Sequence, residues 1–102
     1  MSDLNKMWAA LEQYQPYADK AGHGRSWRRM TKERTSEAAS AAWSKAAAAA
    51  HLTRSKARIR AAWYAASAAG AAATLTAEAA KTERRITQTI EHINQAMKED
   101  KT

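Results

Sequence analysis

The 102-residue chain has no cysteine, no phenylalanine, a single proline and three glycines. Without cysteine it has neither a disulfide framework nor a thiolate metal site, and no other feature is typical of a secreted protein. Its first residues also lack the apolar run of a signal peptide. These absences predict a cytoplasmic protein.

Large apolar side chains are also scarce. Alanine accounts for 27 of the 46 hydrophobic residues, and β-branched and aromatic residues are few and never alternate along the chain. A β-sheet is therefore excluded, because strands depend on such residues at alternate positions. Alanine has the highest helix propensity and lets helices pack closely, so the composition predicts one all-α domain spanning residues 1–102.

Two short helical segments are predicted near the N-terminus. Large apolar residues recur at three- and four-residue spacing across residues 3–14, directly after Ser2, which is a good N-cap. Pro16 ends that amphipathic helix or begins a new turn or short helix over residues 16–21. The glycines at positions 22 and 24 then form a flexible corner.

Beyond this corner the sequence predicts a helical hairpin. Neither glycine nor proline occurs between residues 26 and 69, which favours one long Ala-rich helix with a weak point near His51–Ser55. Gly70 is a suitable C-cap for it, and a last helix is expected over residues 75–98. The predicted fold is thus a long Ala-rich helix folded into an antiparallel hairpin, with a short N-terminal helix beside it.

The last helix contains the clearest periodic pattern. Its large apolar residues repeat at intervals of four, three and four, as in the buried seam of a coiled coil. We expect this seam to pack against large residues of the long helix. The residues predicted to form the core or an interface are Leu52, Ile59, Trp63, Ile86, Ile90, Ile93 and Met97.

An alternative arrangement leaves the helix unbroken at Gly70, since a helical glycine costs only about 1 kcal/mol. The isoleucine seam would then pair with a second copy of the chain, and the protein would be a self-assembling coiled coil. The sequence leaves this homo-oligomer open.

Residues 61–77 are uncharged and follow two arginines, a pattern that resembles a membrane anchor. A membrane-spanning helix, however, requires about 20 clearly apolar residues. This segment consists mainly of alanine with serine and threonine added. A close-packed helix end is the better interpretation, and no membrane association is expected.

Residues that carry out catalysis are nearly absent. His23, His51 and His92 are far apart in the sequence, and neither a metal-binding histidine spacing nor a Gly-rich phosphate loop occurs. Glu33 and Glu37 lie one helical turn apart but among basic residues, which is typical of an ordinary salt-bridge ladder. We therefore expect no enzymatic activity, no cofactor and no metal site.

The strongest functional signal is the position of the positive charge. Residues 25–60 contain ten Lys and Arg residues against two acids, a net charge of +8, whereas the rest of the chain sums to −1. On a helical chain this predicts one basic face for phosphates or carboxylates, with an aromatic residue nearby that stacks on a base. The residues predicted to bind nucleic acid or an acidic partner are Arg25, Arg28, Arg29, Lys32, Lys45, Arg54, Lys56, Arg58, Arg60 and Tyr64.

The glycine corner is a second candidate for anion binding. Gly22, His23 and Gly24 place flexible backbone with free N–H groups at a helix start, directly before three arginines. This combination is typical of a phosphate or carboxylate site.

Three functions remain open. The first is a non-enzymatic basic helical protein that binds nucleic acid, or a protein that handles it, without reading base sequence, because no base-reading motif occurs. The second is an inhibitor or adaptor that docks on an acidic host protein, since the chain resembles in style the small Ala-rich accessory proteins of phages and plasmids. The third is the coiled-coil structural protein.

Overall fold

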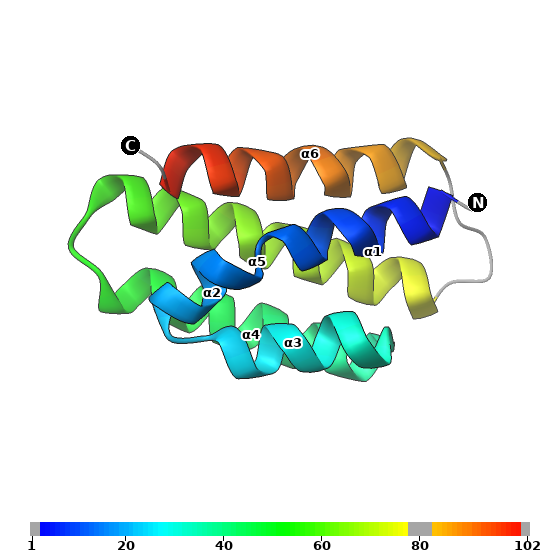
Figure 1. Cartoon of the computed structure of the whole chain (residues 1–102), viewed down its shortest axis with the longest axis horizontal. Coiled ribbons are helices and arrows are strands. Elements are labelled where there is room, and N and C mark those ends of the chain that lie inside the picture. Colours follow the sequence, from blue (N-terminus) through cyan, green and yellow to red (C-terminus); the bar gives the residue numbers. More distant parts are fainter. Residues whose placement is uncertain (1–2, 78–82, 101–102) are drawn as a thin grey trace.

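The computed structural model describes residues 3–77 and 83–100, and this part of the chain forms six α-helices and no strand. The helices are α1 (Asp3–Gln13), α2 (Gln15–Ala21), α3 (Gly24–Glu33), α4 (Ser36–Leu52), α5 (Lys56–Ala77) and α6 (Glu83–Asp100) (Figure 1). The predicted all-α fold is confirmed. The predicted antiparallel hairpin, in which the Ala-rich helix packs on the isoleucine-rich last helix, is confirmed by α5 and α6, and α4 and α5 form a second antiparallel hairpin.

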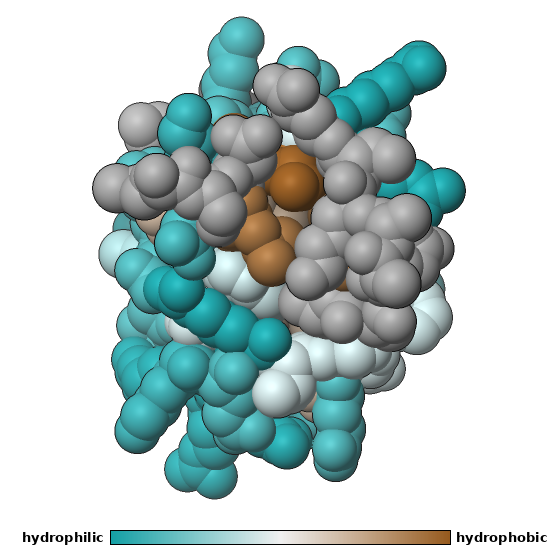
Figure 2. Space-filling model, turned by 90° about the vertical axis from the view of Figure 1, so that its right-hand side faces the viewer, coloured by the Kyte–Doolittle hydropathy of each residue, from teal (hydrophilic) through white to brown (hydrophobic). Residues whose placement is uncertain are grey.

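The helices surround one core that runs along an elongated bundle of 39 × 22 × 17 Å. Helix α5 packs between α4 and α6, α1 packs on α6, and α3 packs on α4. The short α2 joins α1 to α3 toward the end of the bundle at which the C-terminus lies (Figure 1). Figure 2 shows the opposite end, where apolar atoms are visible at the centre and the described residues at the periphery are mainly hydrophilic.

The single helix predicted over residues 26–69 is wrong, because this segment forms α3, α4 and much of α5. Helix α3 ends at Arg34, which has a left-handed backbone with a φ of 55°. Thr35 then begins α4, and its hydroxyl accepts a hydrogen bond of 3.2 Å from the Ala38 N–H. Serine and threonine hydroxyls compete with the helical hydrogen bonds of the backbone, so they start new helices even where glycine and proline are absent.

The second break is the turn between α4 and α5, and it coincides with the weak point predicted near His51–Ser55. Thr53 is extended, and its hydroxyl accepts a hydrogen bond of 3.3 Å from the Ser55 N–H. The Ser55 hydroxyl in turn accepts a hydrogen bond of 3.4 Å from the Arg58 N–H. Ser55 therefore acts as the N-cap of α5.

Gly70 is not the turn that the sequence predicts, since α5 continues through it to Ala77. A cost of about 1 kcal/mol for one glycine does not break a helix whose neighbouring residues are mostly alanine. The last helix begins at Glu83 rather than at residue 75, and the connection before it lies outside the described residues. Over residues 3–77 and 83–100, no helix is long and apolar enough to cross a membrane.

The large side chains of the core come mainly from the N-terminal helices and from α6, whereas the buried residues of α4 are all alanine. The largest fully buried side chains are Trp8, Trp27, Tyr14, Met7, Leu11, Met30, Leu75, Ile93 and Thr89. Alanine keeps the backbones of α4 and α5 close together. The aromatic and methionine side chains of the N-terminal helices fill the space that the alanines leave.

An aromatic cluster fixes α3 against α1 and α2. The Trp27 indole N–H donates a hydrogen bond of 2.7 Å to the Leu11 carbonyl, and the Trp27 ring lies 4.9 Å from the Tyr14 ring. His23 completes the cluster, with its ring centroid 5.8 Å from that of Trp27. His23 is buried, and neither of its ring nitrogens has a hydrogen-bond partner among the residues that the structure describes. Burial lowers the pKa of His23, and the nearby Asp19 carboxylate opposes this shift.

The isoleucine seam of α6 packs within the chain, against the helices on either side of it. Ile86 and Ile93 are buried, and Ile90 and Met97 are partly buried against the same core. Because α5 and α1 cover this seam, its burial needs no second copy of the chain.

The predicted partners of the seam on the long helix are wrong in two cases. Leu52 is 84% exposed and Trp63 is 44% exposed, so neither is a core residue, and Ile59 is only partly buried. Leu52 is the last residue of α4, where the chain turns away from the core. Trp63 lies on the outer side of α5 because the buried side of that helix is occupied by alanines.

Candidate functional site

The α4–α5 hairpin has a single acid, Glu37, in its first turn. No Asp or Glu occurs between Glu37 and Glu78, whereas the same segment contains one Lys in α4 and four Lys and Arg residues in or after the hairpin turn. All five basic side chains are exposed. The segment between Glu37 and Glu78 therefore carries a net charge of +5, and the whole hairpin, with Glu37 included, carries +4.

The basic residues of α3 differ, because most of them are paired with acids. The ion pairs are Arg28–Asp19 (3.6 Å), Arg29–Glu33 (2.8 Å), Arg29–Glu37 (3.9 Å) and Arg34–Glu12 (3.3 Å). The hydrogen bond to Glu33 raises the pKa of Arg29. Arg25 and Lys32 are exposed on the same helix. The positive charge of α3 is thus largely balanced by neighbouring carboxylates.

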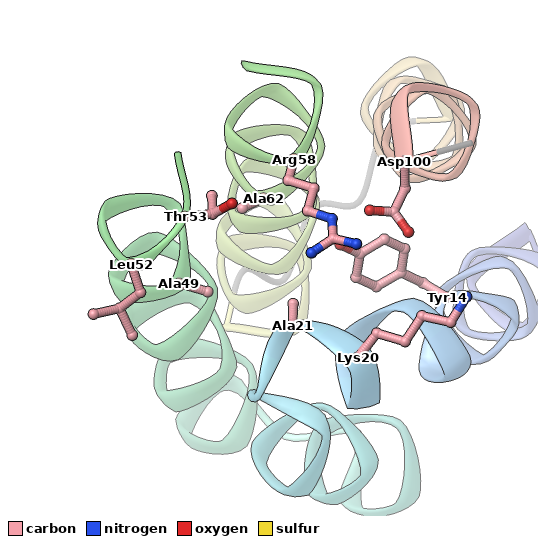
Figure 3. A pocket seen from close by; sticks show the side chains of 9 residues that line it. All are labelled: Tyr14, Lys20, Ala21, Ala49, Leu52, Thr53, Arg58, Ala62 and Asp100. Atoms are coloured by element: carbon pink, nitrogen blue, oxygen red, sulfur yellow. The ribbon is translucent and has the colours of Figure 1, made fainter. Parts of the chain in front are cut away.

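The ten basic residues predicted to form one face are divided between two sides of the bundle. Helix α3 and helix α5 both pack on α4, and Figure 3 shows α4 between them in the ring of helices. Lys45 lies midway along α4 and is exposed. The single helix that was expected to carry these residues is thus divided among α3, α4 and α5, because the chain turns at Arg34–Thr35 and again at Thr53–Ser55.

The hairpin turn holds the basic residues that are not balanced. Arg54 and Lys56 are exposed and form no ion pair within the described part of the chain. Arg60, by contrast, donates a hydrogen bond of 3.1 Å to the Glu99 carboxylate of α6. This hydrogen bond from Arg60, followed by one from Gln95, lowers the pKa of Glu99. Arg54 and Lys56, together with Arg58, therefore remain without an ion pair beside the turn, as far as the described residues go.

Two tryptophans are half-exposed on the outer side of the hairpin. Trp43 of α4 lies over Gly70 of α5, and Trp63 of α5 makes an edge-to-face contact with His51 of α4 at a ring-centroid distance of 5.7 Å. Their exposed fractions are 48% and 44%. Each indole therefore packs partly against the neighbouring helix, and the rest of its ring is accessible to solvent.

The two indoles share one face with a lysine. Lys56, Trp63 and Gly70 are spaced by seven residues, or two helical turns, so they lie on the same side of α5. Trp43 covers Gly70, which places the two tryptophans about 11 Å apart along the helix axis. We call the surface formed by Trp43, Trp63, Arg54 and Lys56 the hairpin face.

The sequence interpretation placed the aromatic residues wrongly on this face. Trp63 was expected in the core, and Tyr64 was expected to stack on a base, but Tyr64 is partly buried with its ring 6.1 Å from that of His92 on α6. Trp43 was missed altogether. The signal for it lies in the phase of α4: the buried alanines include Ala42 and Ala46, and Trp43 falls one position out of step with them.

The predicted anion site at the glycine corner is occupied by the chain itself. A Cβ on Gly24 would overlap the Asp19 carboxylate. Gln15 donates hydrogen bonds of 2.8 Å to Asp19 and 2.9 Å to the Gly24 carbonyl, and Arg28 lies 3.6 Å from the same carboxylate. The corner therefore binds an internal carboxylate where the sequence suggested an external anion.

Comparisons of this chain with protein-family models, with curated proteins and with solved structures gave no match.

Proposed function

We propose that the protein is a non-catalytic nucleic-acid-binding module that uses the hairpin face. The observation that carries this proposal is the pair of half-exposed tryptophans on a positively charged hairpin that has no acid between Glu37 and Glu78. Aromatic side chains stack on unpaired bases at about 1–3 kcal/mol per base, and Lys and Arg bind phosphates without regard to sequence. The preferred ligand is therefore a single strand of DNA or RNA, bound with little base selectivity.

The geometry supports this choice of ligand in two ways. Arg54 and Lys56 have no internal carboxylate partner among the described residues, so binding a phosphate does not require an existing ion pair to break. The separation of the indoles, about 11 Å along the hairpin, leaves room for more than one nucleotide between them. A duplex offers its bases only at groove edges, so it would use the charges but not the indole rings.

The test is a salt-dependent titration of a fluorescently labelled single-stranded oligonucleotide, with the matching duplex in parallel. The single strand is expected to bind more tightly, and Trp43→Ala and Trp63→Ala are each expected to weaken its binding about tenfold. Arg54→Gln and Lys56→Gln should each reduce the slope of log affinity against log salt by about 0.7.

Arg28→Gln is the matched control, because it removes the same charge from the ion-paired side of α3. Its salt slope should equal that of the parent protein. Absence of binding at low salt rejects the proposal. Equal effects of Arg28→Gln and Arg54→Gln would also reject the hairpin face as the contact.

A second candidate, an adaptor or inhibitor that docks on an acidic protein, is favoured by one observation. Leu52 is 84% exposed two residues before Arg54, and an exposed aliphatic side chain contributes little to binding a nucleic acid. Protein interfaces combine such apolar residues with Trp and Arg. Leu52→Asp should abolish docking on a protein partner, whereas it should affect single-strand binding no more than one added negative charge does.

A further inference from the structure

A pocket of about 250 Å³ opens at the end of the bundle, separate from the hairpin face. It lies where α2, the hairpin turn and the last turn of α6 meet, and Figure 3 shows the side chains that line it. Arg58, Tyr14 and Asp100 point toward the same space from three different elements. Polar groups from helices far apart in sequence thus converge at one opening.

Tyr14 supplies an unsatisfied hydrogen-bond donor at the inner end of this pocket. The residue is 1% exposed, and within residues 3–77 and 83–100 its hydroxyl has no hydrogen-bond partner. Burial, with a smaller effect of the Asp100 carboxylate, raises the pKa of Tyr14 well above its usual range. The phenol therefore keeps its proton, and its hydroxyl can donate a hydrogen bond to an acceptor that a ligand brings into the pocket.

Two cations face the same opening without a partner. Arg58 and Lys20 line the pocket, and neither forms an ion pair with the residues that the structure describes. Arg60, two residues along α5, shows the contrast, because Glu99 binds its guanidinium. With the Asp100 carboxylate on the opposite side, the charged groups of the lining sum to +1.

The rest of the wall is apolar. Ala49 and Ala62 are buried residues that form the side of the pocket between α4 and α5, and Leu52 lies at its rim. Drug-sized ligands occupy pockets of about 300–1,000 Å³, so this volume suits a smaller molecule. The lining thus offers donors at one side and an aliphatic surface at the other.

We propose that this pocket binds a small organic carboxylate with an apolar body. A single carboxylate matches the net charge of the lining, and its two oxygens suit the forked donors of Arg58, with Lys20 and the Tyr14 hydroxyl as further donors. A phosphate dianion would bring excess negative charge toward Asp100. The aliphatic body of the ligand packs against Ala49 and Ala62.

This inference does not rest on nucleic-acid binding. Arg58 points into the pocket, whereas Arg54 lies in the exposed turn between α4 and α5. Arg54→Gln and Arg58→Gln therefore form a matched pair, with the same chemical change four residues apart. The first should weaken single-strand binding and leave the pocket intact, and the second should do the reverse.

The experiment is an NMR titration of the full chain with hexanoate, with hexylammonium and inorganic phosphate as comparison ligands. Hexanoate should bind saturably and shift the backbone amides around Thr53 and Ala62, together with those near Tyr14. Hexylammonium, which has the same body and the opposite charge, should cause no saturable shift, and phosphate should bind at least tenfold more weakly. Equal binding of hexanoate and hexylammonium, or none by hexanoate, overturns the proposal.

For each of three substitutions, the proposal predicts whether hexanoate binds more weakly or more tightly. Arg58→Gln should weaken hexanoate binding at least tenfold because it removes the positive charge and the forked donors, and Tyr14→Phe should weaken it severalfold because it removes one O–H donor. Asp100→Asn should strengthen binding, because it removes the one negative charge of the lining. If Arg58→Gln binds hexanoate as the parent does, or if Asp100→Asn weakens binding while the fold is retained, the pocket does not bind carboxylates.

Discussion

The indole of Trp43 lies over Gly70 on the neighbouring helix, with its Cδ1 atom 3.5 Å from the position that a Cβ on Gly70 would occupy. That distance is an ordinary van der Waals contact, and α5 is regular at this point, so alanine fits there. Gly70→Ala should raise the free energy of unfolding by about 0.5–1 kcal/mol, because glycine is the poorer helix former. Urea denaturation measures the change.

Gly24→Ala provides the contrasting control for this prediction. A Cβ at Gly24 would overlap the Asp19 carboxylate, so this substitution should lower the free energy of unfolding. If Gly70→Ala were destabilising instead, residue 70 would have to adopt a backbone conformation that alanine does not accept.

Trp27→Phe should lower the free energy of unfolding by about 2–4 kcal/mol, because it leaves a cavity and removes a buried hydrogen bond. The Trp27 indole N–H donates that bond to the Leu11 carbonyl at 2.7 Å. Tyr14→Phe is the comparison, since the hydroxyl it removes has no partner among the described residues. It should change stability by less than about 1 kcal/mol. Similar losses for both variants would show that the indole hydrogen bond contributes little.

Fluorescence quenching separates the four tryptophans into two classes. Trp43 and Trp63 are half-exposed, whereas Trp8 and Trp27 are buried. The parent protein should show one fraction that acrylamide quenches readily and one that it does not. The double variant with Trp43→Phe and Trp63→Phe should retain only the protected fraction. A readily quenched signal in that variant would mean that the N-terminal helices open in solution.

Stability should fall in acidic solution because of His23. Burial lowers the pKa of this residue in the folded state, so the unfolded chain binds a proton more readily than the folded chain does. The contribution is therefore fully present above the unfolded pKa of about 6.5 and decreases as the pH falls below it. Thermal unfolding between pH 8 and pH 5 measures the effect.

His23→Phe isolates this contribution, since it keeps an aromatic ring beside Trp27 and removes the titratable group. The loss of stability between pH 8 and pH 5 should become smaller in this variant. An unchanged loss would assign the pH dependence to carboxylates rather than to His23.

The sequence predicted the fold class, the hairpin and both short N-terminal helices, because these follow from local propensity and from the spacing of large apolar residues. It placed the turn wrongly. Gly70 has the residue type of a helix end, yet α5 runs through it to Ala77, because one helical glycine costs only about 1 kcal/mol. The break at Thr53–Ser55, where the sequence indicated only a weak point, comes from two hydrogen bonds between hydroxyl groups and the backbone.

The sequence predicted the positive charge of the candidate site but not which basic residues are ion-paired or which tryptophans are exposed. The surplus of basic residues is evident from composition, but whether each is balanced depends on tertiary neighbours such as Asp19 beside Arg28 and Glu99 beside Arg60. The exposure of Trp63 could not be read from sequence either. In a helix lined with alanine, periodicity does not tell which side a single large residue occupies, because any side of the helix resembles the buried one.

The uneven distribution of carboxylates gives the two basic regions different responses to acid. On α3 the guanidinium groups are held by Asp and Glu side chains, so protonating these acids would release positive charge to the solvent. The α4–α5 hairpin contains one carboxylate, Glu37 in its first turn, against five Lys and Arg residues. Neutralising that single acid changes the charge of the hairpin little, whereas neutralising the several acids around α3 would make that side of the bundle much more attractive to polyanions.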